Sequence, residues 1–497
     1  MNSINRKDFL VYDLETFDIR SKYTWISQFA ARRYDSDLKP IDDGTIFYCK
    51  LADDHMPSLD ACVLTGITPQ LTAEKGLNEL EFARSIRTVL LNKKESTIIA
   101  GYNNTAFDNQ VVNHLLFRNL LPPYEPFIDR SLDCFTVTKA MHYLDKDKLK
   151  YLQVARDDGT MRDSLKLEHL SHANGLIHTK AHDALSDVEA TAGLLALIKE
   201  SNYGIYSKYV ANCRKANPMQ FVQAAAKSSM PIMAITKSAL ADSSYATIAV
   251  IIGGNMNSYY AFDLLSHEEQ FTENMEKLMQ AQEKDKDEYI SLMHGFCHTI
   301  KVNECPYVDY ADKYYAGKVD ADEIKERLQD RISKLDSIRK VGYAYSGNYA
   351  GKGNYPSAGE QDATDGRAIK TSVAVEETML DGFINKEAPE LMKVAEQGDK
   401  DALLDALKTL KSKGYSLRVQ TLFSHMIARN YPELFSEKAI SRWREYVKAR
   451  LMEQKSAFID DYNRLMNSNL SPEKLEIVKE VAKYEKEIFD KFSLRLF

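Results

Sequence analysis

Hydrophobic residues gather in short apolar runs near the start of the chain and predict a β-sheet. The runs are rich in β-branched and aromatic residues and cover residues 9–16, 25–34 and 45–51. We expect them to form a meander of three strands. Within residues 56–72, a loop should follow at 64–69, where a Gly and a Pro oppose regular structure.

The hydrophobic period then changes to that of a helix. Asn78 is a candidate N-cap, and the apolar positions after it have helical spacing: Phe82, Ile86, Val89 and Leu90. Residues 97–102 predict another short strand, so the expected order is βββαβ.

Three later helices are predicted, and two of them begin near acidic residues. Apolar positions place Asp108 in the first turn of one helix, which uses Val111, Val112, Leu115 and Leu116. A second helix starts near Ser164 and ends near Gly175. The third has its buried face at Leu185, Val188, Ala192, Leu195 and Ile198. Asp187 lies in its early turns, and His182 lies in the preceding loop.

Two carboxylates interrupt the first strand at positions i and i+2. Successive side chains of a strand point to opposite faces, so Asp13 and Glu15 share one face. Two neighbouring anions on a core strand repel each other and lose hydration. A divalent cation would compensate both costs, and hard cations such as Mg²⁺ prefer carboxylate oxygens. Our hypothesis is that this strand is half of a metal site; the alternative, which this stretch alone leaves open, is an edge strand with a solvated face.

The other polar candidates also have structural alternatives. Asp108 can stabilise a helix N-terminus through the helix dipole. His182 can serve as a cap or as a surface residue. Each of these signals is weak by itself, and only their combination points to a functional site.

Composition limits the class of protein. The 497 residues suggest two to four domains, and a net charge of -7 means that a nucleic-acid site must be a local basic groove. The six Cys have no metal-ligand spacing, so we expect reduced thiols. The sequence has neither a signal-peptide pattern nor an apolar run of about 18 residues. A cytoplasmic protein without membrane association is the expectation.

The acidic residues and the histidine form an ordered set. A D-x-E strand, a helix-opening Asp108 and H-x-x-x-x-D at residues 182–187 resemble the DEDD exonuclease superfamily, in its histidine subclass. Further segments resemble bacterial exonuclease I: residues 12–17, 65–70, 101–104, 167–175, 181–188, 298–306 and 423–432. The resemblance runs along nearly the whole chain and is patchy between residues 310 and 415.

This resemblance implies an α/β (α+β) multidomain fold. A ribonuclease H-like exonuclease domain would span residues 1–201, and an SH3-like β-barrel domain with added helices would span 203–352. A Gly/Tyr-rich linker at 353–368 would lead to an all-helical domain at 369–497. The glycine-dense stretch 341–367 supports this boundary, either as a segment whose tyrosines stack on bases or as a plain interdomain loop.

The implied chemistry is hydrolysis of phosphodiester bonds with two metal ions. Two Mg²⁺ ions, which Mn²⁺ can replace, would be held by Asp13, Glu15, Asp108 and Asp187. His182 would be the general base, since the ordinary pKa of histidine lies near the working pH.

The resemblance also implies contacts with DNA. Besides Glu15, the expected residues are Tyr124, Lys139, Lys166, Phe17 and Gly66. At Lys139 and Lys166 the family carries arginine, and lysine loses its bidentate fork. For Phe17 and Gly66 the alternatives are ordinary packing and an ordinary turn.

The implied function is a processive 3′→5′ exodeoxyribonuclease on single-stranded DNA, active in DNA repair and recombination. Alternatives are a 3′-exonuclease of RNA or short oligonucleotides, and a catalytically silent module that binds single-stranded DNA. The acidic tail of single-stranded DNA-binding protein is an expected partner of a monomeric chain.

Basic residues of the C-terminal region are either solvated or extend the DNA groove: Arg418, Arg429, Arg442, Arg444, Lys448 and Arg450. A charged helix at 320–339 should be solvated over most of its surface.

Overall fold

The structure, a computed structural model, divides into two compact units. It describes residues 8–19, 23–91, 97–176, 183–235, 246–282, 286–315, 321–349, 374–382 and 384–497. The first unit holds the described residues within 1–127, 178–189 and 357–497, and the second holds those within 128–177 and 190–356. These limits differ from the four predicted segments, whose boundaries stay predictions.

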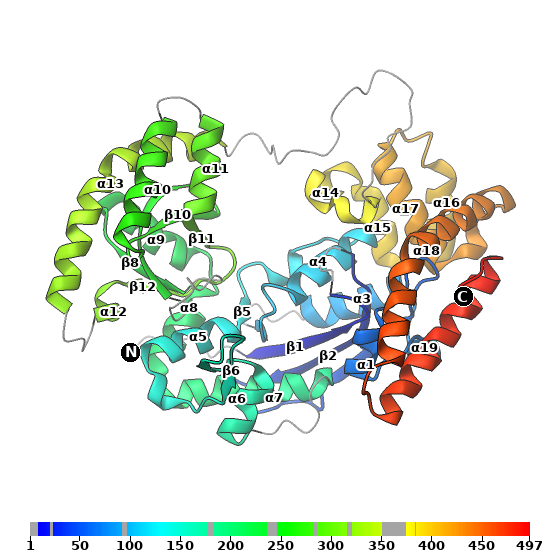
Figure 1. The fold of residues 1–497 in the computed structure, drawn as a ribbon. Coiled ribbons are helices and arrows are strands. Elements are labelled where there is room, and N and C mark those ends of the chain that lie inside the picture. The colour runs from blue at the N-terminus through cyan, green and yellow to red at the C-terminus, as the bar shows by residue number, and fades with distance from the viewer. Residues whose placement is uncertain are drawn as a thin grey trace. The chain divides into compact units, whose positions relative to one another are not determined.

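The first unit is built on a twisted sheet. Its strands are β1 (Phe9–Thr16), β2 (Ile26–Tyr34), β3 (Thr45–Tyr48) and β4 (Ile98–Gly101). They lie in the order β3-β2-β1-β4, with β1 antiparallel to β2 and parallel to β4. Figure 1 shows β1 and β2 side by side. This confirms the predicted meander and the fourth strand.

The two faces of β1 have different roles. Leu10, Tyr12 and Leu14 point into the main hydrophobic core of this unit, together with apolar residues of α3 (Glu79–Leu91) and α4 (Asp108–Arg118). Because side chains alternate along a strand, Asp13 and Glu15 lie on the opposite face. The sheet therefore buries one face under α3 and α4 and presents the two carboxylates on the other.

The predicted loop at 64–69 is present but shorter, because both of its ends are helical. Helix α1 (Leu59–Thr65) and helix α2 (Pro69–Lys75) flank a three-residue connection. Gly66 ends α1 at φ 73°, and Thr68 caps α2, so that Pro69 occupies its first position. Proline is tolerated there because its missing N–H would lack a helical partner. The Gly and the Pro therefore mark an end and a start rather than a long loop.

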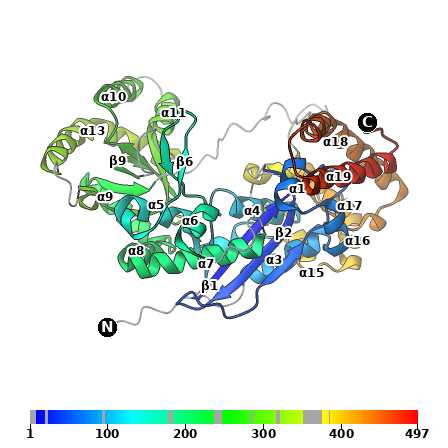
Figure 2. The same cartoon turned by 60° about the horizontal axis from the view of Figure 1, so that its bottom comes forward.

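The C-terminal residues are helical, as predicted, and belong to the same unit. Their elements are η3 (Val375–Asp381), α14 (Ile384–Glu387), α15 (Pro389–Gln397), α16 (Lys400–Thr409), α17 (Leu417–Asn430), η4 (Pro432–Leu434), α18 (Glu437–Met466) and α19 (Pro472–Lys491). Ser471 caps α19 as expected. Apolar side chains of α17, α18 and α19 share one core with α1, α3 and α4, and α19 lies beside α1 (Figure 2).

The second unit contains a five-stranded antiparallel sheet in the order β11-β10-β9-β8-β12. The strands are β8 (Ile232–Ile235), β9 (Ala246–Gly254), β10 (Ser258–Asp263), β11 (Cys297–Lys301) and β12 (Val308–Tyr310). This confirms the β-rich middle region, while its SH3-like character stays a prediction.

Helices and short elements complete the second unit. They are β5 (Ser131–Asp133), α5 (Cys134–Leu144), η2 (Lys146–Lys148), β6 (Gln153–Ala155), β7 (Met161–Asp163), α6 (Leu167–Asn174), α8 (Tyr203–Asn212), α9 (Ala216–Ser228), α10 (Glu268–Gln282), α11 (Lys286–Phe296), α12 (Asp312–Tyr315) and α13 (Ala321–Tyr349). Helix α7 (Ala184–Ser201) begins in the first unit and continues into the second, and η1 (Glu125–Phe127) belongs to the first.

One prediction about α13 is confirmed and another is wrong. The helix buries a single stripe of apolar residues against β9 and its neighbours (Ile324, Leu328, Ile332, Leu335 and Ile338), and most of the positions between them are exposed, as predicted. It also runs through Gly342, where the prediction had irregular backbone. A Cβ at Gly342 would collide with the carbonyl oxygen of Ile252, so glycine here permits close approach of helix and strand. The rest of the glycine-rich stretch, from residue 350, lies outside the described residues.

Within the part of the chain that the structure describes, every helix is too short or too polar to cross a membrane.

Candidate active site

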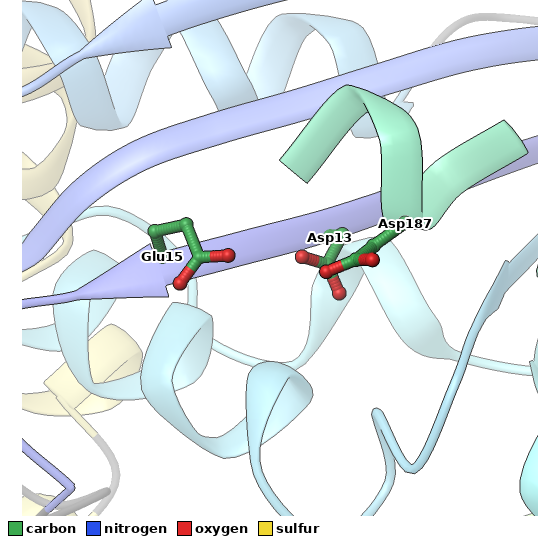
Figure 3. Close-up of side chains that lie close together, drawn as sticks. All are labelled: Asp13, Glu15 and Asp187. Atoms are coloured by element: carbon green, nitrogen blue, oxygen red, sulfur yellow. The ribbon is translucent and has the colours of Figure 1, made fainter. Parts of the chain in front are cut away.

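Strand β1 brings two carboxylates to one face of the sheet, as the alternation predicts. Figure 3 shows Asp13 and Glu15 on the same strand, with their carboxyl groups on the side from which Asp187 approaches. Asp187 comes from the first turn of α7. One oxygen from each of these three residues lies within 4.8 Å of the others. Two segments about 170 residues apart in sequence thus converge on one point.

Asp108 is placed next to this group by a small polar network. It opens α4, as predicted, and its side chain is buried. The following residue, Asn109, accepts a 2.5 Å hydrogen bond from the Tyr12 hydroxyl and a 3.3 Å bond from the Asn104 amide. Since Tyr12 precedes Asp13 on β1, the network ties the start of α4 to the acidic strand.

The four carboxylates perturb one another electrostatically. Burial raises the pKa of Asp13 well above its ordinary value, and the charges of Asp108, Glu15 and Asp187 raise it further. Burial and the charges of Asp187 and Asp108 raise the pKa of Glu15 to about 8. Asp108 therefore acts on the same site, although its oxygens are not part of the 4.8 Å group.

These residues fit a divalent cation. Carboxylate oxygens are the donors that Mg²⁺, Mn²⁺ and Ca²⁺ prefer. Burying several carboxylates without a cation is unfavourable, and the raised pKa values of Asp13 and Glu15 express that cost. A bound cation would relieve it, because its positive charge favours the ionised form of each ligand.

The raised pKa values predict a stability that depends on pH when metal is removed. A carboxyl group with a raised pKa binds more protons in the folded than in the unfolded protein, so stability falls as pH rises. For Glu15 the window runs from its ordinary 4.5 to about 8. In EDTA the parent should lose on the order of 5 °C more in melting temperature between pH 5 and pH 8 than Glu15→Gln. Thermal unfolding followed by fluorescence measures this. Equal slopes for the two proteins would contradict it, and a divalent cation should restore the parent at pH 8.

The remaining predicted residues are placed as follows. His182 lies outside the described residues. Lys166 precedes α6 with 73% of its side chain exposed, and Tyr124 is 39% exposed. Lys139 is buried over the Phe135 ring.

Phe17 and Gly66 are placed as their structural alternatives describe, and their contact with DNA stays a prediction. Phe17 is 1% exposed and packs in the core of the first unit, which leaves its ring no surface for stacking. Gly66 ends α1 in the left-handed region, where an added Cβ would meet open space. Its glycine is explained by backbone conformation.

Of the six basic C-terminal residues, Arg429 is neither solvated nor exposed. Its guanidinium is buried and paired with Asp54 and Glu376 at 2.7 Å each. Arg418 binds Glu387 at 2.8 Å, and Arg450 binds Glu453 at 2.8 Å. Arg429 is therefore an exception to the expected solvation of most of these residues, and whether the others extend a DNA groove stays a proposal.

Sequence reasoning missed the residues that support the carboxylates. Asn109 and Gln28 are both buried polar side chains within or beside apolar elements. The signal that could have found Gln28 is in the apolar run 25–34, where a polar Gln stands among strand formers.

A cavity of about 340 Å³ in the first unit is separate from this site. Both tryptophans of the chain, Trp25 and Trp443, line it together with Arg429. None of the four carboxylates lines it, so the chemistry of the site does not depend on that cavity.

Comparison with protein families identifies both ends of the chain. Residues 10–195 match the exonuclease family model, and residues 374–488 match the model of the exonuclease I C-terminal domain. The two matched segments are thus those of an exonuclease domain and of an exonuclease I C-terminal domain. The first matched segment contains all four carboxylates of the candidate site and His182.

Curated members of the exonuclease I family are similar over part of the chain. Exodeoxyribonuclease I of Escherichia coli K12 is 39% identical over 194 residues, which are 38% of this chain and 40% of the relative. The enzyme of Haemophilus influenzae is 35% identical over 207 residues, 41% of this chain and 42% of the relative. The sequence matches thus span about two-fifths of the length of these relatives.

Solved exonuclease I structures match the fold over nearly all of the chain. A structure of exonuclease I described as suggesting how processivity is achieved has a TM-score of 0.78 at 24% identity, covering 97% of this chain and 99% of its own. The E. coli enzyme in complex with a dA16 oligonucleotide has a TM-score of 0.77 at 24% identity, covering 97% and 100%. The fold is therefore that of exonuclease I, with a ribonuclease H-like exonuclease domain.

Proposed function

We propose that this protein is a 3′→5′ exodeoxyribonuclease that degrades single-stranded DNA to nucleoside 5′-monophosphates. The observation that carries the proposal is the convergence of Asp13, Glu15 and Asp187 within 4.8 Å, inside a segment that matches the exonuclease family. Relatives named exodeoxyribonuclease I and an exonuclease I structure with a DNA oligonucleotide support the choice of substrate.

The proposed metal ligands are the four clustered carboxylates, Asp13, Glu15, Asp108 and Asp187. We assign them two Mg²⁺ ions, for which Mn²⁺ can substitute, because both are hard cations with oxygen ligands. When bound, such a pair neutralises charge on the attacking and leaving oxygens of the phosphodiester.

The proposed general base is His182. Its imidazole would take a proton from the attacking water, since the ordinary pKa of histidine allows a neutral ring near pH 7. The leaving group would be the 3′ oxygen of the preceding nucleotide, which gives a nucleoside 5′-monophosphate as product.

Lys166 and Tyr124 are the proposed contacts to the strand. Both side chains are exposed, and a single-strand site needs cations for phosphates and rings for bases. The burial of Lys139 and Phe17 makes them weaker candidates than these two.

The proposal extends to the biological role of the protein. We propose a processive, monomeric cytoplasmic enzyme of DNA repair and recombination. Its partner would be the acidic tail of single-stranded DNA-binding protein, which a basic surface can bind through charge complementarity. A solved exonuclease I structure described together with SSB supports this partner.

The decisive experiment is a time course on a single-stranded DNA oligomer labelled at its 5′ end. With Mg²⁺ the parent should produce a ladder that shortens from the 3′ end, and EDTA should abolish it. His182→Ala should slow it by about 10²- to 10⁴-fold, the usual contribution of a general base.

Matched substrates separate the alternatives. Equal degradation of an RNA oligomer would favour the broader 3′-exonuclease, and an intact oligomer retained in a gel shift would favour a silent binding module. A competitor-DNA trap that stops digestion after one or a few nucleotides would refute processivity alone.

A further inference from the structure

Gln28 is a buried amide next to the acidic strand. It lies on β2 directly opposite Glu15, and cross-strand partners share a face of the sheet. Its side chain is 2% exposed, in a strand whose other buried residues are mostly apolar. A buried amide must find partners for its oxygen and its nitrogen, so its contacts indicate its role.

Both ends of the amide are used. The oxygen accepts a 3.2 Å hydrogen bond from the backbone N–H of Ala184, and the nitrogen donates a 3.0 Å bond to the Tyr48 hydroxyl. Ala184 is the first residue of α7, where backbone N–H groups lack partners within the helix. The amide therefore fastens the start of α7 to the middle of the sheet.

This bond joins the two halves of the candidate site. One half, Glu15, stands on the neighbouring strand, and the other half, Asp187, lies three residues after Ala184 on the same helical turn. A second tie, the Arg32–Glu189 ion pair at 2.6 Å, is partly exposed and lies farther along α7. Unlike this pair, the Gln28 bond is buried and reaches the first residue of α7, one turn from Asp187.

We infer that Gln28 is a positioning residue that holds the Asp187 carboxylate within binding distance of Asp13 and Glu15, and so sets the affinity of the site for divalent cations. The inference rests on the proposed function only in requiring that the site binds a divalent cation. Partners of this kind, which orient metal ligands without touching the metal, commonly control affinity.

The chemistry of the amide explains why this position is neutral. A carboxylate here would add negative charge beside Glu15, whose pKa is already raised by Asp187 and Asp108. A methionine has similar length and fills the space, yet it gives the Ala184 N–H no oxygen. Gln28→Met therefore removes the bond and leaves the charge unchanged.

The test is a Mn²⁺ titration of the full-length protein without DNA, followed by electron paramagnetic resonance of free Mn²⁺. Gln28→Met should bind Mn²⁺ about 10- to 100-fold more weakly than the parent. Tyr48→Phe is the matched control, because it removes the other hydrogen bond of the amide and keeps the Ala184 bond. It should stay within about twofold of the parent.

Melting temperatures in EDTA separate positioning from general packing. If Gln28→Met melts lower in EDTA yet binds Mn²⁺ like the parent, the inference is overturned, and it is overturned as well if Tyr48→Phe loses as much affinity. Should Gln28→Met fail to fold, Gln28→Asn replaces it, since a shorter amide stays polar but does not reach Ala184. A parent that binds no Mn²⁺ would refute the proposed function, whereas a binding parent with an equal Gln28 variant refutes only the role of Gln28.

Discussion

Asp13→Asn is expected to lower the rate of DNA degradation by about 10³-fold or more. Asp13 is central to the carboxylate cluster, because three other carboxylates act on its pKa. Metal ions supply several kcal/mol of charge stabilisation in phosphodiester hydrolysis, and each 1.36 kcal/mol corresponds to a factor of ten in rate. An amide keeps the shape of the side chain but removes the negative ligand. Single-turnover digestion of a labelled oligomer measures the loss.

Asp60→Asn is the control for this prediction. Asp60 is an exposed carboxylate of the same unit that pairs with Arg464 on the surface. Its removal should leave the rate within about twofold of the parent, as for most surface substitutions. If Asp13→Asn retained a tenth or more of the parent rate, the cluster would not be the catalytic metal site.

The fold near the site could be predicted where the signal is local. Alternation along β1 assigned Asp13 and Glu15 to one face, and the apolar spacing of α4 and α7 placed Asp108 and Asp187 in first turns. These predictions depend on hydrophobic period and on helix starts, both of which are read within about ten residues. Their convergence on one point came only from the resemblance to a family.

The errors arose where capping or tertiary packing decides the structure. The loop predicted from Gly66 and Pro69 is shorter than expected, because each of the two residues sits at a helix end where its backbone is favourable. Gly342 suggested irregular backbone, yet it lies inside α13 because the helix approaches a strand closely there. A glycine can occur because the chain is irregular, because a helix ends there or because two elements approach closely. Only its neighbours in space show which of these applies.

Long-range polar contacts were the least predictable feature. Gln28 and Ala184 are 156 positions apart, and Arg429 and Asp54 are 375 apart. Arg429 was therefore assigned to a basic surface, since its carboxylate partners are remote in sequence.

Inside the first unit, the Arg429 network joins the C-terminal helices to the segment that matches the exonuclease family. The guanidinium contacts Asp54 with both Nε and Nη2, donates a 3.0 Å bond to the Tyr23 hydroxyl and pairs with Glu376 at 2.7 Å. His425 adds a 2.9 Å bond to the same Glu376 oxygen. Burial alone would raise the pKa of Asp54 and Glu376, but the charge of Arg429 holds both below their ordinary values.

Arg429→Met is expected to destabilise the protein by about 3–5 kcal/mol, because it leaves two buried carboxylates without their cation. At about 1 °C for each kcal/mol in a chain of 497 residues, the melting temperature should fall by about 3–5 °C. The loss should be smaller at pH 5 than at pH 8, since in the variant the two carboxyl groups can take up protons that Arg429 prevents them from binding in the parent. Arg464→Met, which removes an exposed arginine from the same unit, should shift the melting temperature by no more than about 1 °C. Two outcomes would mean that the ion pairs of Arg429 do not hold the C-terminal helices against the segment that matches the exonuclease family. One is an equal shift in melting temperature for the two variants, and the other is a loss of stability in Arg429→Met that does not change with pH.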